Sequence, residues 1–474
     1  MSLKLKISEV NKVEEQGLSI FEFDRINWWP LIRVFIFQNY ELQKHSVIDK
    51  SKLIYPKRVL WEIKIWMDLK KKIKQAKVTV CDKFIPVDTC FFTSETNYKK
   101  DAYNKYINRF LDPLYIKTPG SKVIFVRSKK IADNYSVETL FETEYIELQL
   151  KLKKQIAIIF RTLFFFSTKI TYSDIHKLHI ENIINHIKSF SYFKNYNFSL
   201  LPKWFDAVFD SYDVAQLIFK YLKPKLFIQY CYYFPNQFGY TLAANSLNIK
   251  SIDYQHGIQN KYHYGYGSWV NVPTIGYQLL PSEFWVFSDR EEINLLASFS
   301  KSTHRIKVIG NAWIDYWKDH KTDYDNLSWL HQLKSRGFKI ILYTLSNNVL
   351  DRSHFFWKYL KRCNSANYYF LFRLHPGYVY INDTLVNRLQ EINFVNYNII
   401  ESSKTELYDL LNECDIHITQ NSTVAEEALY FKKKSIIIDS KWMIYFESYI
   451  LKGEMFFANN VLELDDILNK EFKI

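Results

Sequence analysis

Short β-rich runs alternate with helical segments in two successive rounds, and this pattern limits the fold more than any other feature of the chain. The first round occupies residues 86–320 and the second residues 336–465. Strands that alternate with helices form parallel sheets covered by helices on both faces. We therefore predict an α/β protein with two doubly wound, Rossmann-like domains that face a cleft. The expected strands lie in VDTCFFTS, KVIFVRS, KLFIQYCYY, KSIDYQHG, EFWVFS and RIKVIGNAW, and then in KIILYTLS, YYFLFRLHPG, NIIESS, IHITQNS and KSIIID.

One further segment precedes these two rounds of strands and helices, and another joins them. Residues 1–85 are expected to form an N-terminal helical cap, and residues 314–337 a crossover linker. Within the cap, segment 64–77 places apolar residues at helical spacing beside lysines. Such a helix either lies on anionic lipid headgroups or packs its apolar stripe on the protein while its lysines face water. Peripheral contact with the inner face of a membrane therefore stays open.

The amino-acid composition limits the classes of molecule that the protein is expected to bind. The chain has 63 Lys and Arg against 50 Asp and Glu, a net charge of +13, which favours an anionic partner. Nucleotides, anionic membranes and nucleic acids all fit this charge, but no nucleic-acid-binding motif is present and no nucleic acid is expected. Five scattered cysteines without a Cys-x-x-Cys pair and an N-terminus rich in charge indicate a cytoplasmic protein. Residues 226–249 are too polar to cross a membrane and are predicted to be a strand followed by a helix.

Ligands of open α/β sheets bind beyond the carboxyl ends of the strands, and the first candidate site follows the run KSID. His256 can act as a base near neutral pH, and Gln255 and Gly257 flank it on the expected acceptor side. His256 can also be a structural histidine that satisfies a loop carbonyl. Farther along, Tyr264 and Tyr266 either offer flat faces to a sugar ring or pack within the loop.

The second candidate site ends the run YYFLF. Pro376 restricts the backbone of His375 and so orients its imidazole, and Arg373 lies two residues earlier. These groups suit the binding of a phosphate, or its protonation as it leaves. The alternative is a strand that ends in an ordinary proline turn.

The third candidate site lies between the run IHIT and a helix. Asn421, Ser422 and Thr423 would present an amide, hydroxyls and free backbone N–H groups to a phosphate at the helix start. Thr423 and Glu426 also fit a capping box, in which they satisfy the helix end. Glu426 or Glu427 would instead hold ribose hydroxyls.

Other motifs are missing. The chain has neither a P-loop nor a Gly-x-Gly-x-x-Gly turn after a strand, which argues against NTPases and nicotinamide-dependent oxidoreductases. The acidic pair Asp323 and Asp325 falls in the expected linker and not after a strand, and the histidines lack zinc-site spacing. No metal ion and no cofactor are expected.

The motifs together resemble bacterial GT-B-fold glycosyltransferases of capsule and O-antigen biosynthesis. The stretches ANSLNIKSIDYQHGIQNKYHYGY, PSEFWVFSD and IKVIGNAW resemble the QHG-bearing N-terminal half of such surface-polysaccharide transferases. RLHPG and QNSTVAEEAL are similar to the His-Pro and Ser/Thr motifs of bacterial sialyltransferases and Kdo transferases. The resemblance covers residues 225–439 and leaves the N-terminal cap outside.

This resemblance implies roles for individual residues. His375 would contact the donor phosphate and assist its departure, and Ser422 and Thr423 would bind the same phosphate. The acceptor base would be His256, as in polyol-phosphate transferases with a related layout. It would instead be a carboxylate early in the chain, as in sialyltransferases, for which Glu95 and Asp112 are the candidates. The choice among them stays open.

The resulting expectation is a metal-independent, inverting glycosyltransferase. Its partners would be a nucleotide-sugar donor and an oligosaccharide or lipid-linked glycan acceptor of a growing surface polysaccharide. A CMP-linked nonulosonic acid or Kdo is the favoured donor, with a UDP-sugar as the other option. Two alternatives remain: a polyol-phosphate transferase that uses CDP-glycerol or CDP-ribitol, and a non-catalytic partner in polysaccharide assembly.

Overall fold

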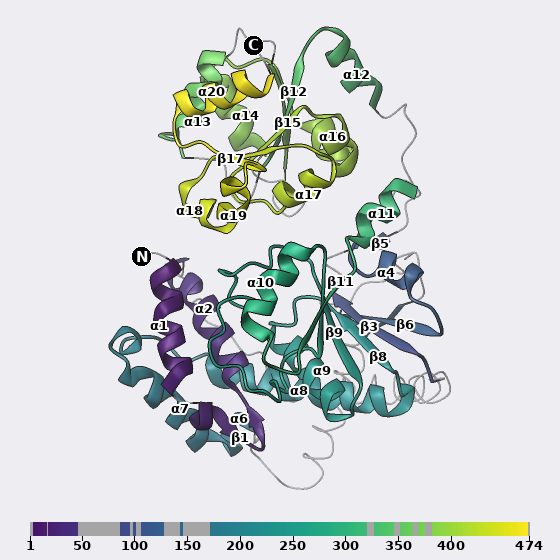
Figure 1. Ribbon diagram of the computed structural model, residues 1–474, viewed down its shortest axis with the longest axis vertical. Coiled ribbons are helices and arrows are strands. Elements are labelled where there is room, and N and C mark those ends of the chain that lie inside the picture. The colour runs from purple at the N-terminus through teal and green to yellow at the C-terminus, as the bar shows by residue number, and fades with distance from the viewer. Residues whose placement is uncertain are drawn as a thin grey trace, which may run out of the picture. The chain divides into compact units, whose positions relative to one another are not determined.

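The computed structural model describes residues 3–16, 18–45, 86–94, 98–100, 106–127, 143–145, 171–319, 327–345, 351–363, 368–374 and 382–472. The chain divides into two compact units, residues 1–313 and 314–474 (Figure 1). Each unit contains one large sheet whose strand pairs are all parallel. The predicted α/β fold class with two doubly wound domains is therefore confirmed.

The sheet of the first unit has the order β11-β10-β9-β8-β3-β6-β7. From β3 the chain continues to β6 and β7 on one side, whereas from β8 it continues to β9, β10 and β11 on the other. This is the strand order of a Rossmann fold with one added strand, and its switch point lies between β3 and β8. The strands are β3 (Thr89–Ser94), β6 (Lys122–Arg127), β7 (Thr143–Tyr145), β8 (Leu226–Gln229), β9 (Lys250–Tyr254), β10 (Glu283–Val286) and β11 (Arg305–Val308).

Both faces of this sheet are buried because its side chains alternate between two apolar layers. Cys90 and Phe92 point to α8 (Leu201–Leu222) and α9 (Pro235–Ser246), while Phe91 points to the opposite layer with α4 (Asp112–Lys117). The helices α8 and α9 cross so closely that a Cβ on Gly239 would lie 2.2 Å from the Val208 carbonyl oxygen. The remaining elements are a two-stranded antiparallel sheet of β4 (Tyr98–Lys100) and β5 (Tyr106–Asn108), and the helices α6 (Tyr172–Ile175), α7 (Lys177–Ser189), η3 (Ser191–Phe193) and α10 (Asp289–Phe299). Helix α11 (Ala312–Asp319) begins in the first unit, and most of its residues belong to the second.

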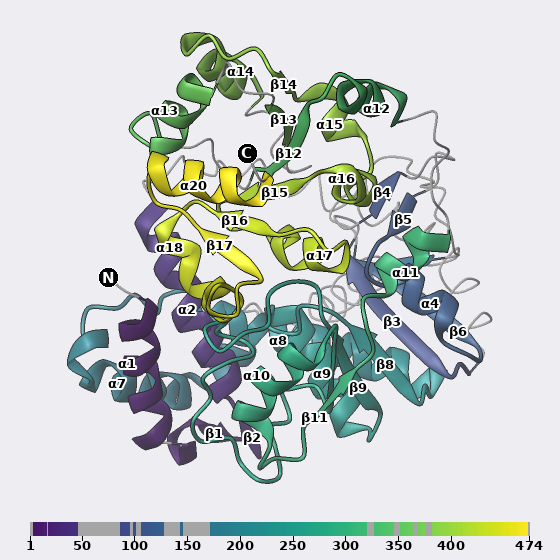
Figure 2. The same ribbon diagram turned by 45° about the horizontal axis from the view of Figure 1, so that its top comes forward.

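The N-terminal segment belongs to the first unit. Its helices α1 (Leu3–Gln16) and α2 (Trp29–His45) lie side by side in Figures 1 and 2, and the Lys6 ammonium donates to the Phe37 carbonyl at 3.0 Å. Phe35 of α2 packs on Phe198 and on Trp204 of α8. The apolar run from Phe21 to Leu42 becomes helical only at Trp29, because η1 (Leu18–Phe21) and a hairpin of β1 (Glu22–Phe23) and β2 (Ile26–Asn27) precede helix α2. The basic segment 64–77 lies outside the described residues.

The sheet of the second unit has the order β14-β13-β12-β15-β16-β17, again the Rossmann order, with its switch point between β12 and β15 (Figure 2). Ile341 and Tyr343 of β12 lie in an apolar core with residues of α13 and α20. The strands are β12 (Lys339–Thr344), β13 (Tyr368–Arg373), β14 (Tyr397–Asn398), β15 (Ile416–Thr419), β16 (Ser435–Ile437) and β17 (Met455–Phe457). The helices are α12 (Ser328–Ser335), α13 (Phe355–Arg362), α14 (Asn382–Glu391), α15 (Ile400–Lys404), α16 (Leu407–Glu413), α17 (Val424–Tyr430), α18 (Ser440–Met443), η7 (Ile444–Phe446), α19 (Glu447–Leu451) and α20 (Val461–Phe472).

Two local predictions are wrong. The expected linker 314–337 contains α12 and most of α11, since its apolar residues Trp317 and Leu330 are buried. In the run NIIESS only the first residue belongs to a strand, and α15 begins at Ile400. The strand and helix predicted for residues 226–249 are confirmed as β8 and α9. Among the helices that the structure describes, none is long and apolar enough to span a membrane.

Candidate functional site

Two hydroxyl groups bridge the switch point of the first sheet. Thr93 lies near the carboxyl end of β3 and Tyr230 directly follows β8, and their hydroxyl oxygens are 2.6 Å apart. The Asn108 side chain donates to the Thr93 hydroxyl at 2.6 Å. All three side chains are buried. The switch point therefore contains a connected polar group where an α/β fold binds its ligand.

Asn108 also builds the turn that carries Asp112. Its side-chain oxygen accepts from the backbone N–H of Phe110 and of Leu111, and its own N–H donates to Asp112 Oδ2 at 2.8 Å. Asp112 is buried, and its Oδ1 has no partner within the described part of the chain. Burial raises the pKa of this carboxyl to about 7, although the hydrogen bond from Asn108 opposes the shift. Asp112 can therefore exchange a proton near neutral pH.

His256 stands beside this group in the loop after β9. Its ring lies 6.2 Å from the Tyr230 ring and meets the Phe110 ring edge-on at 6.3 Å, measured between ring centroids. Its Nε2 is 3.0 Å from the Tyr233 hydroxyl oxygen, and its buried Nδ1 has no hydrogen-bond partner among the described residues. Burial, together with the nearby Arg109 cation, lowers the pKa of His256 to about 4, so the imidazole is neutral at pH 7.

The residues around His256 hold its loop in place. The Gln255 amide donates to the Gly257 carbonyl at 3.0 Å, and its oxygen accepts from Phe287 N–H at 2.7 Å. Tyr266 is fully buried, and its hydroxyl donates to Asp253 Oδ2 at 2.6 Å. Gln255 and Tyr266 are therefore held within the loop, which for Tyr266 is the second of the two roles considered from the sequence, and the acceptor-side role of Gln255 stays a prediction.

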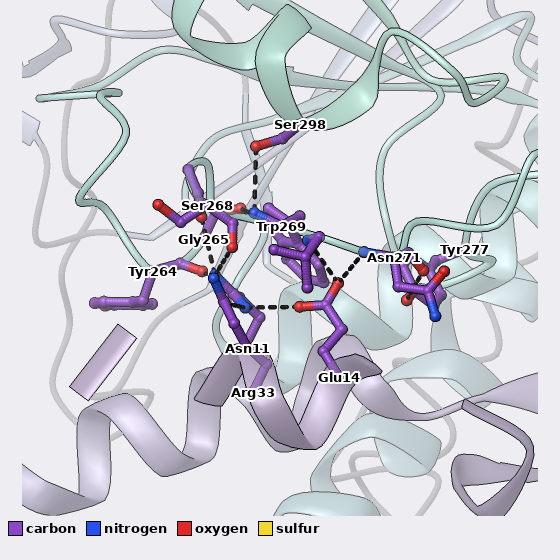
Figure 3. A network of polar contacts seen from close by, with 12 residues as sticks. Asn11, Glu14, Arg33, Tyr264, Gly265, Ser268, Trp269, Asn271, Tyr277 and Ser298 are labelled. Atoms are coloured by element: carbon purple, nitrogen blue, oxygen red, sulfur yellow. Dashed lines mark hydrogen bonds and ion pairs between the residues drawn. The ribbon is translucent and has the colours of Figure 1, made fainter. Parts of the chain in front are cut away.

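A buried ion pair fixes the continuation of this loop to the N-terminal helices (Figure 3). The Arg33 and Glu14 side chains are completely buried, and Arg33 Nη1 lies 2.9 Å from Glu14 Oε2. The second oxygen of Glu14 accepts from the backbone N–H groups of Val270 and Asn271. The guanidinium donates to five acceptors, which are Tyr264 O, Asn11 Oδ1, Glu14 Oε2, Gly267 O and Ser268 O.

Tyr264 joins this clamp to the His256 site. Its ring stacks on Phe37 with centroids 5.7 Å apart, and its hydroxyl accepts from the Gln38 amide at 3.1 Å. The same ring meets the Tyr233 ring edge-on at 5.4 Å, and Tyr233 is the partner of His256. Tyr264 therefore packs within the loop, which is the second of the two roles considered from the sequence.

The switch point of the second sheet is closed by a buried histidine. His417 Nε2 is 2.8 Å from Thr344 Oγ1, and its Nδ1 is 2.8 Å from Ser435 Oγ. Burial lowers the pKa of His417 to about 3, so it stays neutral and structural. The Thr419 hydroxyl donates to the Thr344 carbonyl and accepts from the N–H of Ser422, so it connects this layer to the loop above.

That loop contains Gln420, Asn421, Ser422 and Thr423. Ser422 Oγ accepts from Val424 N–H at 3.3 Å, whereas Thr423 makes no side-chain cap. The expected capping box between Thr423 and Glu426 is therefore wrong, because Thr423 has a helical backbone and its side chain does not reach the helix end. Helix α17 has seven residues, so its end alone makes a weak anion site. Asn421 Oδ1 and Glu427 Oε2 are buried without a partner in the described chain.

The remaining predicted site residues fall into two groups. Arg373 donates to the Ser402 carbonyl at 2.7 Å and to the Thr405 carbonyl, so it caps the end of α15. Part of its guanidinium is thus already used. Glu95, His375, Pro376 and the acidic pair at 323 and 325 lie outside the described residues. Among the residues that the structure describes, no group of three His, Cys, Asp or Glu side chains could hold a metal ion.

Sequence reasoning missed four members of the first site: Thr93, Asn108, Tyr230 and Tyr233. The run QYCYYF after β8 was a usable signal, because hydroxyl-bearing side chains directly follow a predicted strand. Asn108 lies in a short two-stranded sheet that no periodic pattern announces. Its role depends on side-chain geometry that only the folded chain provides.

No protein-family model and no curated protein matches this chain. Among solved structures, the chain is similar to S. aureus MnaA in a co-structure with UDP, with 13% identity and a TM-score of 0.47 over 82% of this chain and 88% of that chain. It is similar to UDP-GlcNAc 2-epimerase from Neisseria meningitidis bound to UDP-GlcNAc, with 12% identity and a TM-score of 0.45 over 81% and 91%. It is also similar to Anabaena Alr3699/HepE in complex with UDP, with 12% identity and a TM-score of 0.40 over 81% and 90%. Likenesses this distant carry no argument about activity.

Proposed function

We propose that this protein is a glycosyltransferase of the GT-B type. It transfers a sugar from a nucleotide-sugar donor to a growing bacterial surface polysaccharide or oligosaccharide, without a metal ion. The observation that carries the proposal is the first switch point, where a carboxyl of raised pKa and an imidazole of lowered pKa lie around one bridged pair of hydroxyls. Displaced pKa values at such a position are typical of acid–base catalysis.

The first unit supplies the acceptor base. Displacement at an anomeric carbon needs a group that removes the proton of the attacking hydroxyl. Asp112 has a pKa of about 7 and one oxygen to which no described residue donates, which suits proton removal at neutral pH. His256 has a pKa of about 4, so it is a weaker base, but its Nδ1, which no residue of the described chain bonds, can accept a hydrogen bond from the same hydroxyl. We assign the base to Asp112 and the orientation of the acceptor to His256.

The second unit holds the donor phosphate. Asn421 and Ser422 follow the end of β15 at the second switch point, and we assign the side-chain N–H groups of Asn421 and the hydroxyl proton of Ser422, whose oxygen accepts from Val424 N–H, to the phosphate oxygens. Thr423 and His375 complete this proposed set on the grounds of their motifs alone. Neutral donors and a histidine stabilise a leaving nucleoside phosphate without a metal ion. The proposed donors are a CMP-linked nonulosonic acid or Kdo, or a UDP-sugar.

The first experiment measures thermal unfolding of the full chain with CMP, CDP, UDP and GDP. A ligand that binds only the folded state, at about 100 times its Kd, stabilises it by roughly 2.7 kcal/mol. A selective shift with CMP or UDP identifies the donor class, and Ser422→Ala should reduce this shift. Product formation from the matching nucleotide sugar should then collapse in Asp112→Asn. Absence of a shift with every nucleotide would refute the proposal and favour a non-catalytic role in polysaccharide assembly.

A polyol-phosphate transferase is the second candidate. It is favoured by the position of His256, which lies in the first switch-point cluster as the histidine of an HG sequence. A selective thermal shift with CDP would support it. Mass spectrometry of the product would then show an added phosphodiester in place of a glycosidic bond.

A further inference from the structure

A cation for which the described residues supply no counter-ion lies in the first switch-point cluster. Arg109 directly follows β5 and is half-buried, and its guanidinium carbon lies 4.6 Å from the centroid of the Phe110 ring. The same Phe110 ring meets the His256 ring edge-on and lies 5.1 Å from the Tyr230 ring. Phe110 therefore contacts both the Arg109 guanidinium and the His256 imidazole, which we propose lies against the acceptor.

Within the described residues, no carboxylate or carbonyl accepts a hydrogen bond from Arg109. Asp112, three residues along the chain, uses Oδ2 on the Asn108 N–H and leaves Oδ1 without a partner, so it does not pair with Arg109. Two other arginines, Arg33 and Arg352, have acceptors that use their charge. Arg33 is saturated by five acceptors, and Arg352 pairs with a glutamate at 2.9 Å.

The neighbouring groups do not neutralise this charge. Burial keeps His256 uncharged at pH 7, and the raised pKa of Asp112 leaves that carboxyl only partly ionised there. A guanidinium that is partly removed from water and has no fixed partner favours an anionic ligand. Its planar fork matches the two oxygens of a carboxylate or a phosphate.

We propose that Arg109 binds a negatively charged group, a carboxylate or a phosphate, on the acceptor that lies against His256. The acceptor is then an anionic glycan, either one that contains a sugar acid or one that carries a phosphate. This inference rests on the proposed function, because it concerns the acceptor of that same site. The bidentate pair would fix the acceptor hydroxyl relative to Asp112 as well as adding affinity.

The test is equilibrium binding of small probes to the full chain, followed by the ¹³Cε1 resonance of His256. His256→Gln assigns this resonance. The probes are methyl β-D-glucuronide with its neutral match methyl β-D-glucoside, and glycerol 3-phosphate with its neutral match glycerol. The variants are Arg109→Gln, Arg109→Lys and, as the control, Arg305→Gln, which removes the same charge from the exposed strand β11 of the same unit.

We expect an anionic probe to shift the His256 resonance and its neutral match to leave it unchanged. Arg109→Gln should weaken this binding roughly tenfold or more, because a charge-assisted hydrogen bond is lost. Arg109→Lys should keep part of the affinity, and Arg305→Gln should keep all of it. Binding of the glucuronide alone identifies a sugar acid, and binding of glycerol 3-phosphate alone identifies a phosphate.

Three results would overturn the inference: no binding of either anionic probe at its solubility limit, equal binding of charged and neutral probes, or unchanged affinity in Arg109→Gln. These results are distinct from a failure of the transferase proposal, which is read from nucleotide binding. Anion binding without nucleotide binding would keep the Arg109 site and remove the transferase. Nucleotide binding without anion binding would do the reverse.

Discussion

The Arg33–Glu14 ion pair should be the strongest single attachment of the acceptor-side loop to the N-terminal helices. Arg33→Met would leave the Glu14 carboxylate buried, with only the N–H groups of Val270 and Asn271 as donors, at 3.2 and 3.1 Å. It would also remove the donor from three loop carbonyls. Breaking one partner of a buried pair costs about 3–5 kcal/mol, since the other charge loses its compensation.

Removing the second charge should recover part of that loss. In Glu14→Gln the amide oxygen can still accept from the two backbone N–H groups, while the uncompensated charge disappears. We therefore expect the double variant of Arg33→Met and Glu14→Gln to be more stable than Arg33→Met alone, by about 1–2 kcal/mol. That value lies within the range of coupling energies for residues in direct contact. If the stability losses of the two single substitutions simply added in the double variant, this result would contradict a buried ion pair.

Hydrogen exchange measured by mass spectrometry suits this test, because a chain with two units lacks a single well-defined free energy of unfolding. A local loss of about 4 kcal/mol corresponds to exchange roughly a thousandfold faster across residues 264–271. The control is Arg352→Met, whose ion pair with Glu391 is exposed and should contribute less than about 1 kcal/mol. Exchange in Arg33→Met within roughly fivefold of the unmodified protein would refute the reasoning.

Three further predictions concern the first unit. The value of kcat/KM should rise with pH through about 7 if Asp112 is the base, and through about 4 if His256 is the base. A pH–rate profile separates these two cases, and Asp112→Asn should abolish the rise near pH 7. Gly239→Ala should lower the Tm by several degrees, because the new Cβ would lie 2.2 Å from the Val208 carbonyl oxygen. Such overpacking costs about 1–3 kcal/mol or more. An unchanged melting curve would contradict the close crossing of α8 and α9. Burial raises the pKa of Asp253 from 3.8 to about 7. Between pH 3.8 and about 7 the folded state therefore holds one more proton than the unfolded state. The contribution of Asp253 to the free energy of unfolding should then fall as pH rises, by up to about 1.4 kcal/mol per pH unit. Asp253→Asn should remove that decline in a series of unfolding curves, and an identical pH dependence in both proteins would show that the carboxyl is ionised when folded.

The sheets were predictable because their strands are short apolar runs between polar turns. Both faces are largely buried in the strands Tyr368–Arg373 and Ile416–Thr419, so their apolar composition predicts a strand without any tertiary information. The short strand at Met455–Phe457 and helix α15 were missed, since each is too short to show a period. The sequence indicated where the carboxyl edges lie, and therefore that His256 and Ser422 would stand at them.

Side-chain roles were less predictable because they depend on contacts between distant segments. The sequence left two roles open for Tyr264, an aromatic face for a sugar or packing within the loop, and its ring stacks on Phe37 of the distant helix α2. The same two roles were open for Tyr266, and its hydroxyl donates a hydrogen bond to Asp253. Thr423 and Glu426 matched a capping box by spacing alone, while the helical backbone of Thr423 prevents the cap. In each case the residue type was read correctly and its partner was not visible in the local sequence.

The two switch points differ in a way that assigns them different tasks. Each is built from hydroxyls at the ends of neighbouring strands, Thr93 with Tyr230 in the first unit and Thr344 with Thr419 in the second. In the second, the buried His417 has both ring nitrogens bonded to hydroxyls and is not available for proton transfer, and the atoms without a partner in the described chain, Asn421 Oδ1 and Glu427 Oε2, lie in the loop and helix that follow β15. In the first, a carboxyl oxygen and a ring nitrogen are left without partners in the described chain. Unsatisfied buried polar atoms are costly unless a ligand uses them, and on this ground we propose that the first unit removes the acceptor proton and the second binds the donor.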